Sequence, residues 1–98
     1  MAFKIKWTTR ADVKFDNILQ YLTTNYGEQV TKNFINKVYD FLDILSEFPE
    51  IGSIENQEKS IRGFTIVKQI NIFYRIKGET IILLDFFDNR KNPKSKRF

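Results

Sequence analysis

Residues 45–52, Leu-Ser-Glu-Phe-Pro-Glu-Ile-Gly, separate a helical part of the chain from a strand-rich part. Proline disfavours helical geometry in the residue before it, so Phe48 is expected to lie at the end of a helix. The following residues, 49–59, are mostly polar and are predicted to form an exposed loop. The regions on either side of this boundary therefore predict different secondary structures.

The region before the boundary predicts two helices. Apolar residues recur there every three or four positions, which is the spacing of an amphipathic helix. Thr8 and Thr9 offer hydroxyl groups to cap the first helix, and Gly27 suits its left-handed stop. Because the link between the helices is so short, they are expected to form an antiparallel hairpin. The expected buried residues are Ala11, Phe15, Ile18, Leu22, Tyr26, Val30, Phe34, Val38, Phe41, Leu42 and Leu45.

Four other segments have the character of β-strands. Residues 2–7 alternate apolar and polar side chains, which indicates a strand with one buried face. Segments 61–68, 70–77 and 80–87 are rich in Ile, Val, Phe and Tyr, and Lys77-Gly78-Glu79-Thr80 suits a tight turn. This order predicts an α+β fold, β-α-α-β-β-β, with the helix hairpin packed on one face of a mainly antiparallel four-stranded sheet.

Length and composition narrow the class of protein. The 98 residues suit one domain, 1–98, with a basic, flexible tail at about 91–98. The chain has no Cys and no His, which excludes disulfides and the commonest metal ligands, so no metal and no cofactor are expected. No apolar run approaches the ~20 residues that cross a bilayer. We therefore expect a soluble cytoplasmic protein with no membrane partner.

Charge is distributed unevenly along the chain. Residues 1–59 hold seven basic and nine acidic side chains, a net charge of −2. Residues 60–98 hold nine basic and three acidic side chains, a net charge of +6. This asymmetry predicts that the C-terminal part meets a polyanion or an acidic protein segment. The alternative is a compositional bias, since most of the basic residues are Lys.

Four short motifs together resemble those of the RelE/ParE toxin superfamily. Residues 45–52 resemble its L-x-x-F-P-x-x-G, and Ile61-Arg62 resembles its I-R strand start. Tyr74-Arg75-Ile76 resembles its Y-R-I, and residues 88–93, Asp-Asn-Arg-Lys-Asn-Pro, stand in the place of its terminal H-x-R-x-P. The motifs occur in the family's order and span most of the chain.

The resemblance implies the toxin of a type II toxin–antitoxin system, which inhibits growth when free of its cognate antitoxin. Some relatives cleave mRNA, usually on the ribosome, whereas others poison DNA gyrase and are not nucleases. Where relatives that cleave RNA carry a strand arginine and a terminal His, this chain has Asn71 and Asp88, and the late Tyr of some relatives falls near Lys96. We therefore expect a ParE-like action on DNA gyrase. A ribosome-dependent mRNA endonuclease is the alternative, a non-toxic nucleic-acid-binding module is the second alternative, and whether the chain is an enzyme stays open.

Candidate site residues follow from this comparison. Arginine is a permanently charged planar fork that suits phosphate, so target or phosphate contacts are assigned to Arg62, Arg75, Arg90 and Lys91. Arg62, Arg75 and Arg90 are also the catalytic candidates if the chain cleaves RNA. Lys68 and Asp88 are then the acid or base to test first.

Several of these residues have a purely structural alternative. Arg62 could pair with a helix carboxylate such as Asp40 or Asp43, and Arg75 could line a solvated sheet edge. Tyr74 is expected to be a core ring with a hydrogen-bonded hydroxyl. Asp85 lies in an apolar run and is expected to be exposed or paired, because a buried lone charge costs too much free energy.

The antitoxin is expected to be acidic or partly disordered and to fold on binding. Such a segment could lay an amphipathic helix along the helix hairpin or add a strand to an open sheet edge. We expect a groove that includes exposed apolar residues from the helices, with Arg or Lys binding the antitoxin's carboxylates. The sequence does not assign the individual residues of this groove.

Overall fold

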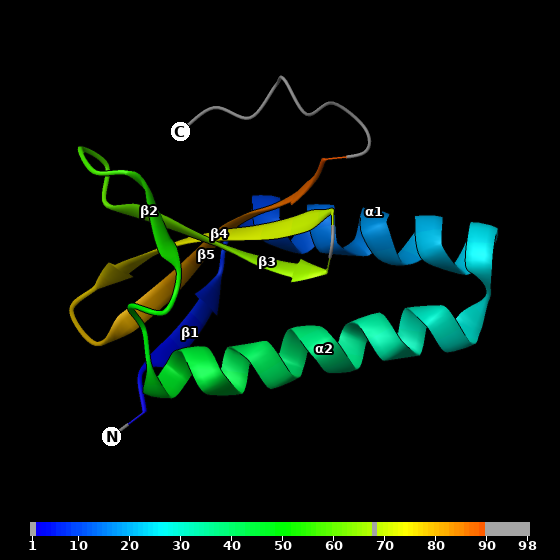
Figure 1. Ribbon diagram of the computed structural model, residues 1–98, viewed down its shortest axis with the longest axis horizontal. Coiled ribbons are helices and arrows are strands. Elements are labelled where there is room, and N and C mark those ends of the chain that lie inside the picture. Colours follow the sequence, from blue (N-terminus) through cyan, green and yellow to red (C-terminus); the bar gives the residue numbers. More distant parts are fainter. Residues whose placement is uncertain (1, 68, 90–98) are drawn as a thin grey trace.

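A helix hairpin and a five-stranded sheet make up the computed structural model, which describes residues 2–67 and 69–89 (Figure 1). The predicted α+β class and the antiparallel pair of helices are confirmed. In chain order the elements are β1 (Lys4–Trp7), α1 (Thr9–Tyr26), α2 (Glu28–Glu47), β2 (Ser53–Asn56), β3 (Ile61–Val67), β4 (Ile70–Lys77) and β5 (Thr80–Asp88).

The helices begin and end close to their predicted positions. Thr8 is the N-cap of α1, and its hydroxyl oxygen accepts a hydrogen bond from the Ala11 N–H at 3.1 Å. Gly27 ends α1 with φ 92° and ψ 171°, so φ is positive as expected, but the backbone is extended rather than left-handed helical. Only glycine adopts such a conformation readily, and a single residue therefore serves as the end of one helix and the cap of the next. No helix of the described residues is long and apolar enough to cross a membrane.

The sheet has the strand order β1-β5-β4-β3-β2. The first pair, β1 with β5, is parallel and the other pairs are antiparallel, which confirms the mainly antiparallel prediction. The predicted count of four strands is wrong, because Ser53–Asn56 pairs with β3 inside the expected polar loop. An edge strand has one neighbour and needs no alternation of apolar residues, so the polar sequence of this segment did not indicate a strand.

The sheet has one helix-covered face and one opposite face, which we call the open face. Ile72 and Tyr74 belong to the core cluster that includes both helices. Since successive side chains of a strand point to opposite faces, Phe73 and Arg75 lie on the open face. The register between β4 and β5 shifts after Phe73, because Phe73 pairs with Asp85 whereas Tyr74 pairs with Leu83. The extra residue is Leu84, and this bulge places Asp85 on the open face.

The core between helices and sheet combines aliphatic side chains with a cluster of packed aromatic rings. The Trp7 ring lies 5.4 Å from Phe86 and 5.2 Å from Phe15, measured between ring centroids. Tyr26 and Val30 were expected in this core, but their exposed fractions are 55% and 40%. Both lie beside the turn that joins the helices. The helical periodicity of the sequence continues up to this turn, but the burial of apolar side chains in the core does not.

Tyr74 fixes the turn that follows α2. Its buried hydroxyl donates to the Pro49 carbonyl at 2.8 Å and accepts from the Gly52 N–H at 2.9 Å, which confirms the predicted hydrogen-bonded core ring. A Cβ atom at Gly52 would lie 2.7 Å from this hydroxyl, so only glycine fits there. The Arg62 guanidinium donates to the Gly52 and Glu50 carbonyls at 2.8 and 3.2 Å. The Phe-Pro-x-x-Gly turn is thus held from β3 and β4.

Tyr74→Phe is expected to lower the free energy of unfolding by about 1–3 kcal/mol, because the buried Gly52 N–H loses its acceptor. Urea unfolding followed by circular dichroism measures the change. Tyr26→Phe is the matched control, because Tyr26 is exposed and its substitution should change little. Equal stability of the two variants would contradict a structural role for the Tyr74 hydroxyl.

The same substitution should alter the dependence of stability on alkaline pH. Burial raises the pKa of Tyr74 above its ordinary value of 10.0, against the opposing effect of the Gly52 hydrogen bond. The folded state therefore favours the neutral hydroxyl. The neutral Tyr74 hydroxyl contributes fully to the free energy of unfolding below the pKa that Tyr74 has in the unfolded chain. This contribution is lost as the pH rises through the pKa of Tyr74 in the folded protein. The unfolding free energy of Tyr74→Phe should fall less steeply than that of the unchanged protein above pH ~10.

Candidate functional site

Exposed cations gather at one end of the open face, where the register of three strands brings them together. Lys4 and Lys77 both pair with Thr80, and Lys6 and Arg75 both lie opposite Ile82. Among the described residues, none of these four cations has an ion-pair partner. We call this set the open-face cluster, and its members are Lys4, Lys6, Arg75 and Lys77.

Arg75 and Arg62, both predicted target contacts, lie on opposite faces of the sheet. Arg75 is exposed on β4, which has a neighbour on each side, so the alternative placing it at a sheet edge is wrong. Arg62 pairs in register with Tyr74 and thus points to the helix side. Its ion pair is with Glu50, at 4.0 Å, and not with Asp40 or Asp43. The two arginines therefore cannot contact one phosphate from one surface.

The other predicted residues are distributed as follows. Asp88 is buried at the end of β5 and pairs with Ile70. Ile70 is five positions from Arg75 along β4, so the partner of Asp88 lies roughly 16 Å from Arg75 at the usual strand rise. Lys68, Arg90, Lys91 and the tail at 91–98 lie outside the described residues.

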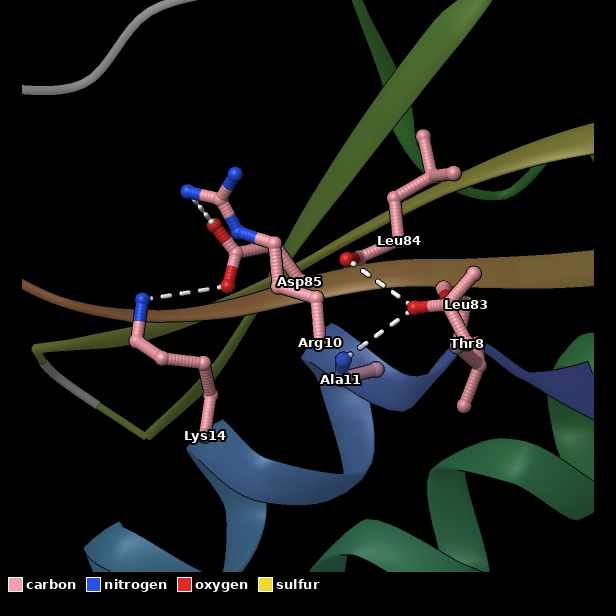
Figure 2. A network of polar contacts seen from close by, with 7 residues as sticks. All are labelled: Thr8, Arg10, Ala11, Lys14, Leu83, Leu84 and Asp85. Carbon is pink, nitrogen blue, oxygen red and sulfur yellow. Dashed lines mark hydrogen bonds and ion pairs between the residues drawn. The ribbon is translucent and has the colours of Figure 1, made fainter.

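Asp85 is paired, as one of its two expected outcomes required. Only 1% exposed, its carboxylate lies 3.3 Å from Arg10 Nη2 and 3.1 Å from Lys14 Nζ (Figure 2). The Thr8 hydroxyl donates to the Leu83 carbonyl at 2.8 Å, which holds the start of α1 beside this strand. Arg10 and Lys14 were not predicted as site residues. Their spacing of four on one helix was the available signal.

A cavity adjoins this ion pair. Its volume is about 560 Å³, and Arg10, Lys59 and Arg75 bring three cations to its wall. The remaining lining residues are Thr8, Ile61, Leu84 and Asp85. The cavity therefore joins the open-face cluster to the Arg10–Asp85 pair through Arg75.

An apolar groove lies elsewhere, between the helix hairpin and the β3–β4 turn. Its volume is about 260 Å³, and Val30 and Lys37 of α2 contribute an exposed apolar side chain and a cation. The other lining residues are Leu22, Asn33, Phe34, Val67, Gln69 and Ile70. This combination has the composition that was expected of an antitoxin groove.

The side chains nearest the predicted catalytic positions are engaged in structural contacts. Both hydrogen-bonding positions of the Tyr74 hydroxyl are used by the turn before β2. Asn71 accepts a hydrogen bond from the Thr65 hydroxyl at 2.8 Å across the open face. Within residues 2–67 and 69–89, no group of three acidic side chains is placed to hold a metal ion. The arrangement supports binding of anions more directly than proton transfer.

Known proteins are similar to this chain in sequence and in fold. The family described as "ParE toxin of type II toxin-antitoxin system, parDE" matches residues 5–93. Toxin ParE3 of Caulobacter vibrioides is 28% identical over 78 residues, which are 79% of this chain and 77% of that protein.

Solved structures agree on the fold. A chain of the chromosomal ParDE system from P. aeruginosa superposes with a TM-score of 0.74 at 17% identity, covering 89% of this chain and 96% of that one. A chain of the E. coli DinJ–YafQ toxin–antitoxin complex gives 0.62 at 7% identity, covering 94% and 98%. Because the family match spans nearly the whole chain, the protein belongs to the ParE toxin family of type II toxin–antitoxin systems.

Proposed function

We propose that this ParE-family toxin inhibits growth by acting on DNA gyrase in the cytoplasm, and that the open-face cluster contacts the target. The observation that carries the proposal is the convergence of exposed cations from β1 and β4 on the face that the helices leave uncovered. Clustered cations raise the rate of encounter with an anionic target, and added salt weakens this attraction. Arg90 and Lys91 belong to the same proposal as residues that follow β5.

The mRNA-endonuclease alternative has less support from the described residues. Cleavage requires a base for the 2′-hydroxyl and an acid for the leaving oxygen. Tyr74 and Arg62 are held by the turn at Pro49–Gly52, and Asp88 is buried far from Arg75 along β4. In the part of the chain that the structure describes, the open-face cluster thus offers electrostatic attraction, and the predicted acid or base Asp88 does not lie beside it.

We also propose that a cognate antitoxin occupies the apolar groove between the hairpin and the β3–β4 turn. Val30 is 40% exposed although it lies among apolar lining residues, which suits an apolar anchor from a partner. Lys37 lies at the same groove and can pair with a carboxylate of an acidic segment. An antitoxin segment that folds as an amphipathic helix would satisfy both features.

Arg75→Ala should relieve growth arrest, because it removes the arginine of the open-face cluster, which also lines the cavity. The experiment expresses the toxin without antitoxin and follows growth, gyrase-dependent supercoiling of a plasmid and primer extension on mRNA. We expect lost supercoiling with intact transcripts for the unchanged toxin, and a reduced effect for Arg75→Ala.

The matched control is Lys32→Ala, which removes an exposed cation from α2. It should leave the arrest unchanged. Cleaved transcripts with normal supercoiling would establish the endonuclease alternative in place of gyrase. Growth without arrest despite a folded, abundant protein would refute both target assignments.

Val30→Asp should weaken antitoxin binding more than tenfold, because a carboxylate would enter the apolar groove and repel an acidic partner. Calorimetry with the product of the neighbouring reading frame measures the affinity. Val13→Asp is the control, since Val13 is 51% exposed on α1 and does not line the groove. Equal affinities of the two variants would exclude the groove as the antitoxin site.

A further inference from the structure

The pairing at Asp85 leaves an excess of positive charge beside the cavity. One carboxylate lies between two cations, Arg10 and Lys14, so the three groups together carry a charge of +1. The Asp85 side chain is 2% exposed, whereas that of Arg10 is 70% exposed. The buried carboxylate therefore holds an arginine that still presents most of its surface to solvent. Figure 2 shows the contacts of Asp85 with Arg10 and with Lys14.

Local backbone structure places this pair on the open face. Without the bulge at Leu84, the alternation of Ile81 and Leu83 would direct residue 85 into the core. The Thr8 hydroxyl bonds the Leu83 carbonyl and caps α1, which sets the first turn of the helix beside Asp85. The start of α1 and the bulge in β5 are thus built as one unit.

The cavity beside this unit brings together cations from three parts of the chain. Arg10 comes from α1, Lys59 from the segment before β3, and Arg75 from β4. With Asp85 the lining carries a net charge of +2. Two arginine forks and a lysine are a common set of donors for a phosphate group, because arginine matches its oxygens two at a time.

The surroundings of the cavity favour a linear polyanion over a small phosphate compound. Arg75 lines the cavity and is also in register with Lys6 across Ile82. Lys4 and Lys77 occupy the next position on the same face, two residues further along each strand. Positive charge therefore continues from the cavity across the open face, as a phosphodiester backbone requires.

We propose that the cavity binds a phosphate of a nucleic-acid backbone, with Arg10 and Arg75 as contact residues and Asp85 as the residue that positions Arg10. The inference deepens the proposed action on gyrase, an enzyme that works on DNA. The cavity geometry supports phosphate binding whichever nucleic acid is bound, because DNA and RNA offer the same phosphate group.

Fluorescence anisotropy of a labelled duplex DNA and of a single-stranded RNA of equal length tests the proposal with the purified toxin alone. Arg10→Ala should weaken binding about tenfold and lower the slope of log affinity against log salt by about one. Lys32→Ala removes the same charge from α2 and should retain the affinity. Thermal unfolding confirms that each variant is folded.

Asp85→Asn separates positioning from general attraction. The substitution raises the net charge by one, so diffuse attraction alone would strengthen nucleic-acid binding. The proposal expects the opposite, a loss of several-fold, because Arg10 loses the partner that fixes its guanidinium. If this variant does not fold, Arg10→Lys is the alternative, since it keeps the charge, removes the fork and should bind more weakly.

Each probe has a defined meaning. Tighter binding of the duplex identifies DNA as the source of the phosphate, and tighter binding of the single strand identifies RNA. Binding of poly-glutamate in preference to both, of inorganic phosphate alone, or of no probe would overturn the proposal. Gyrase inhibition is assayed separately, so toxicity through gyrase without nucleic-acid binding would refute only this inference.

Discussion

The central position of β4 is the constraint on which the rest of the structure depends. Ile72, Phe73 and Tyr74 are completely buried, and the strand is hydrogen-bonded on both edges. Because the side-chain period of a strand is two, one residue faces the helices and the next faces the open side. Tyr74 can therefore organise the turn after α2 while Arg75 is exposed on the open face. The two adjacent residues thus serve opposite faces of the sheet.

Periodicity in the sequence was enough to predict both helices and three of the four later strands, and residue type indicated the Thr8 cap. It could not predict β2, since Ser53–Asn56 is a polar edge strand held by pairing to β3. It also extended the buried stripe to Tyr26 and Val30, because periodicity describes a helix but not the extent of the sheet beneath it. These errors share one cause, namely that long-range contacts are absent from local patterns.

The candidate site was predictable only in part. Charge distribution and family motifs indicated Arg75, and Asp85 stood out as a charge in an apolar run. Its partners Arg10 and Lys14 were hidden, because they lie more than 70 positions earlier and reach Asp85 only through the bulge at Leu84. The sequence also could not show that Arg62 and Arg75 lie on opposite faces of the sheet, since the strand register decides which face each arginine occupies.

The parallel pairing of β1 with β5 has a consequence for the order in which the protein's surfaces form. Lys4–Trp7 can pair with Thr80–Leu83 only after the chain has been made as far as residue 83, and contacts so distant in sequence form slowly. The cationic surface needs both parts of the chain, because Lys4, Lys6 and Arg10 lie before or at the start of the hairpin whereas Arg75 and Lys77 follow it. Completion of this surface is therefore a late step of folding. The helix hairpin, in contrast, consists of local contacts and folds early, so the two surfaces of the protein form at different times.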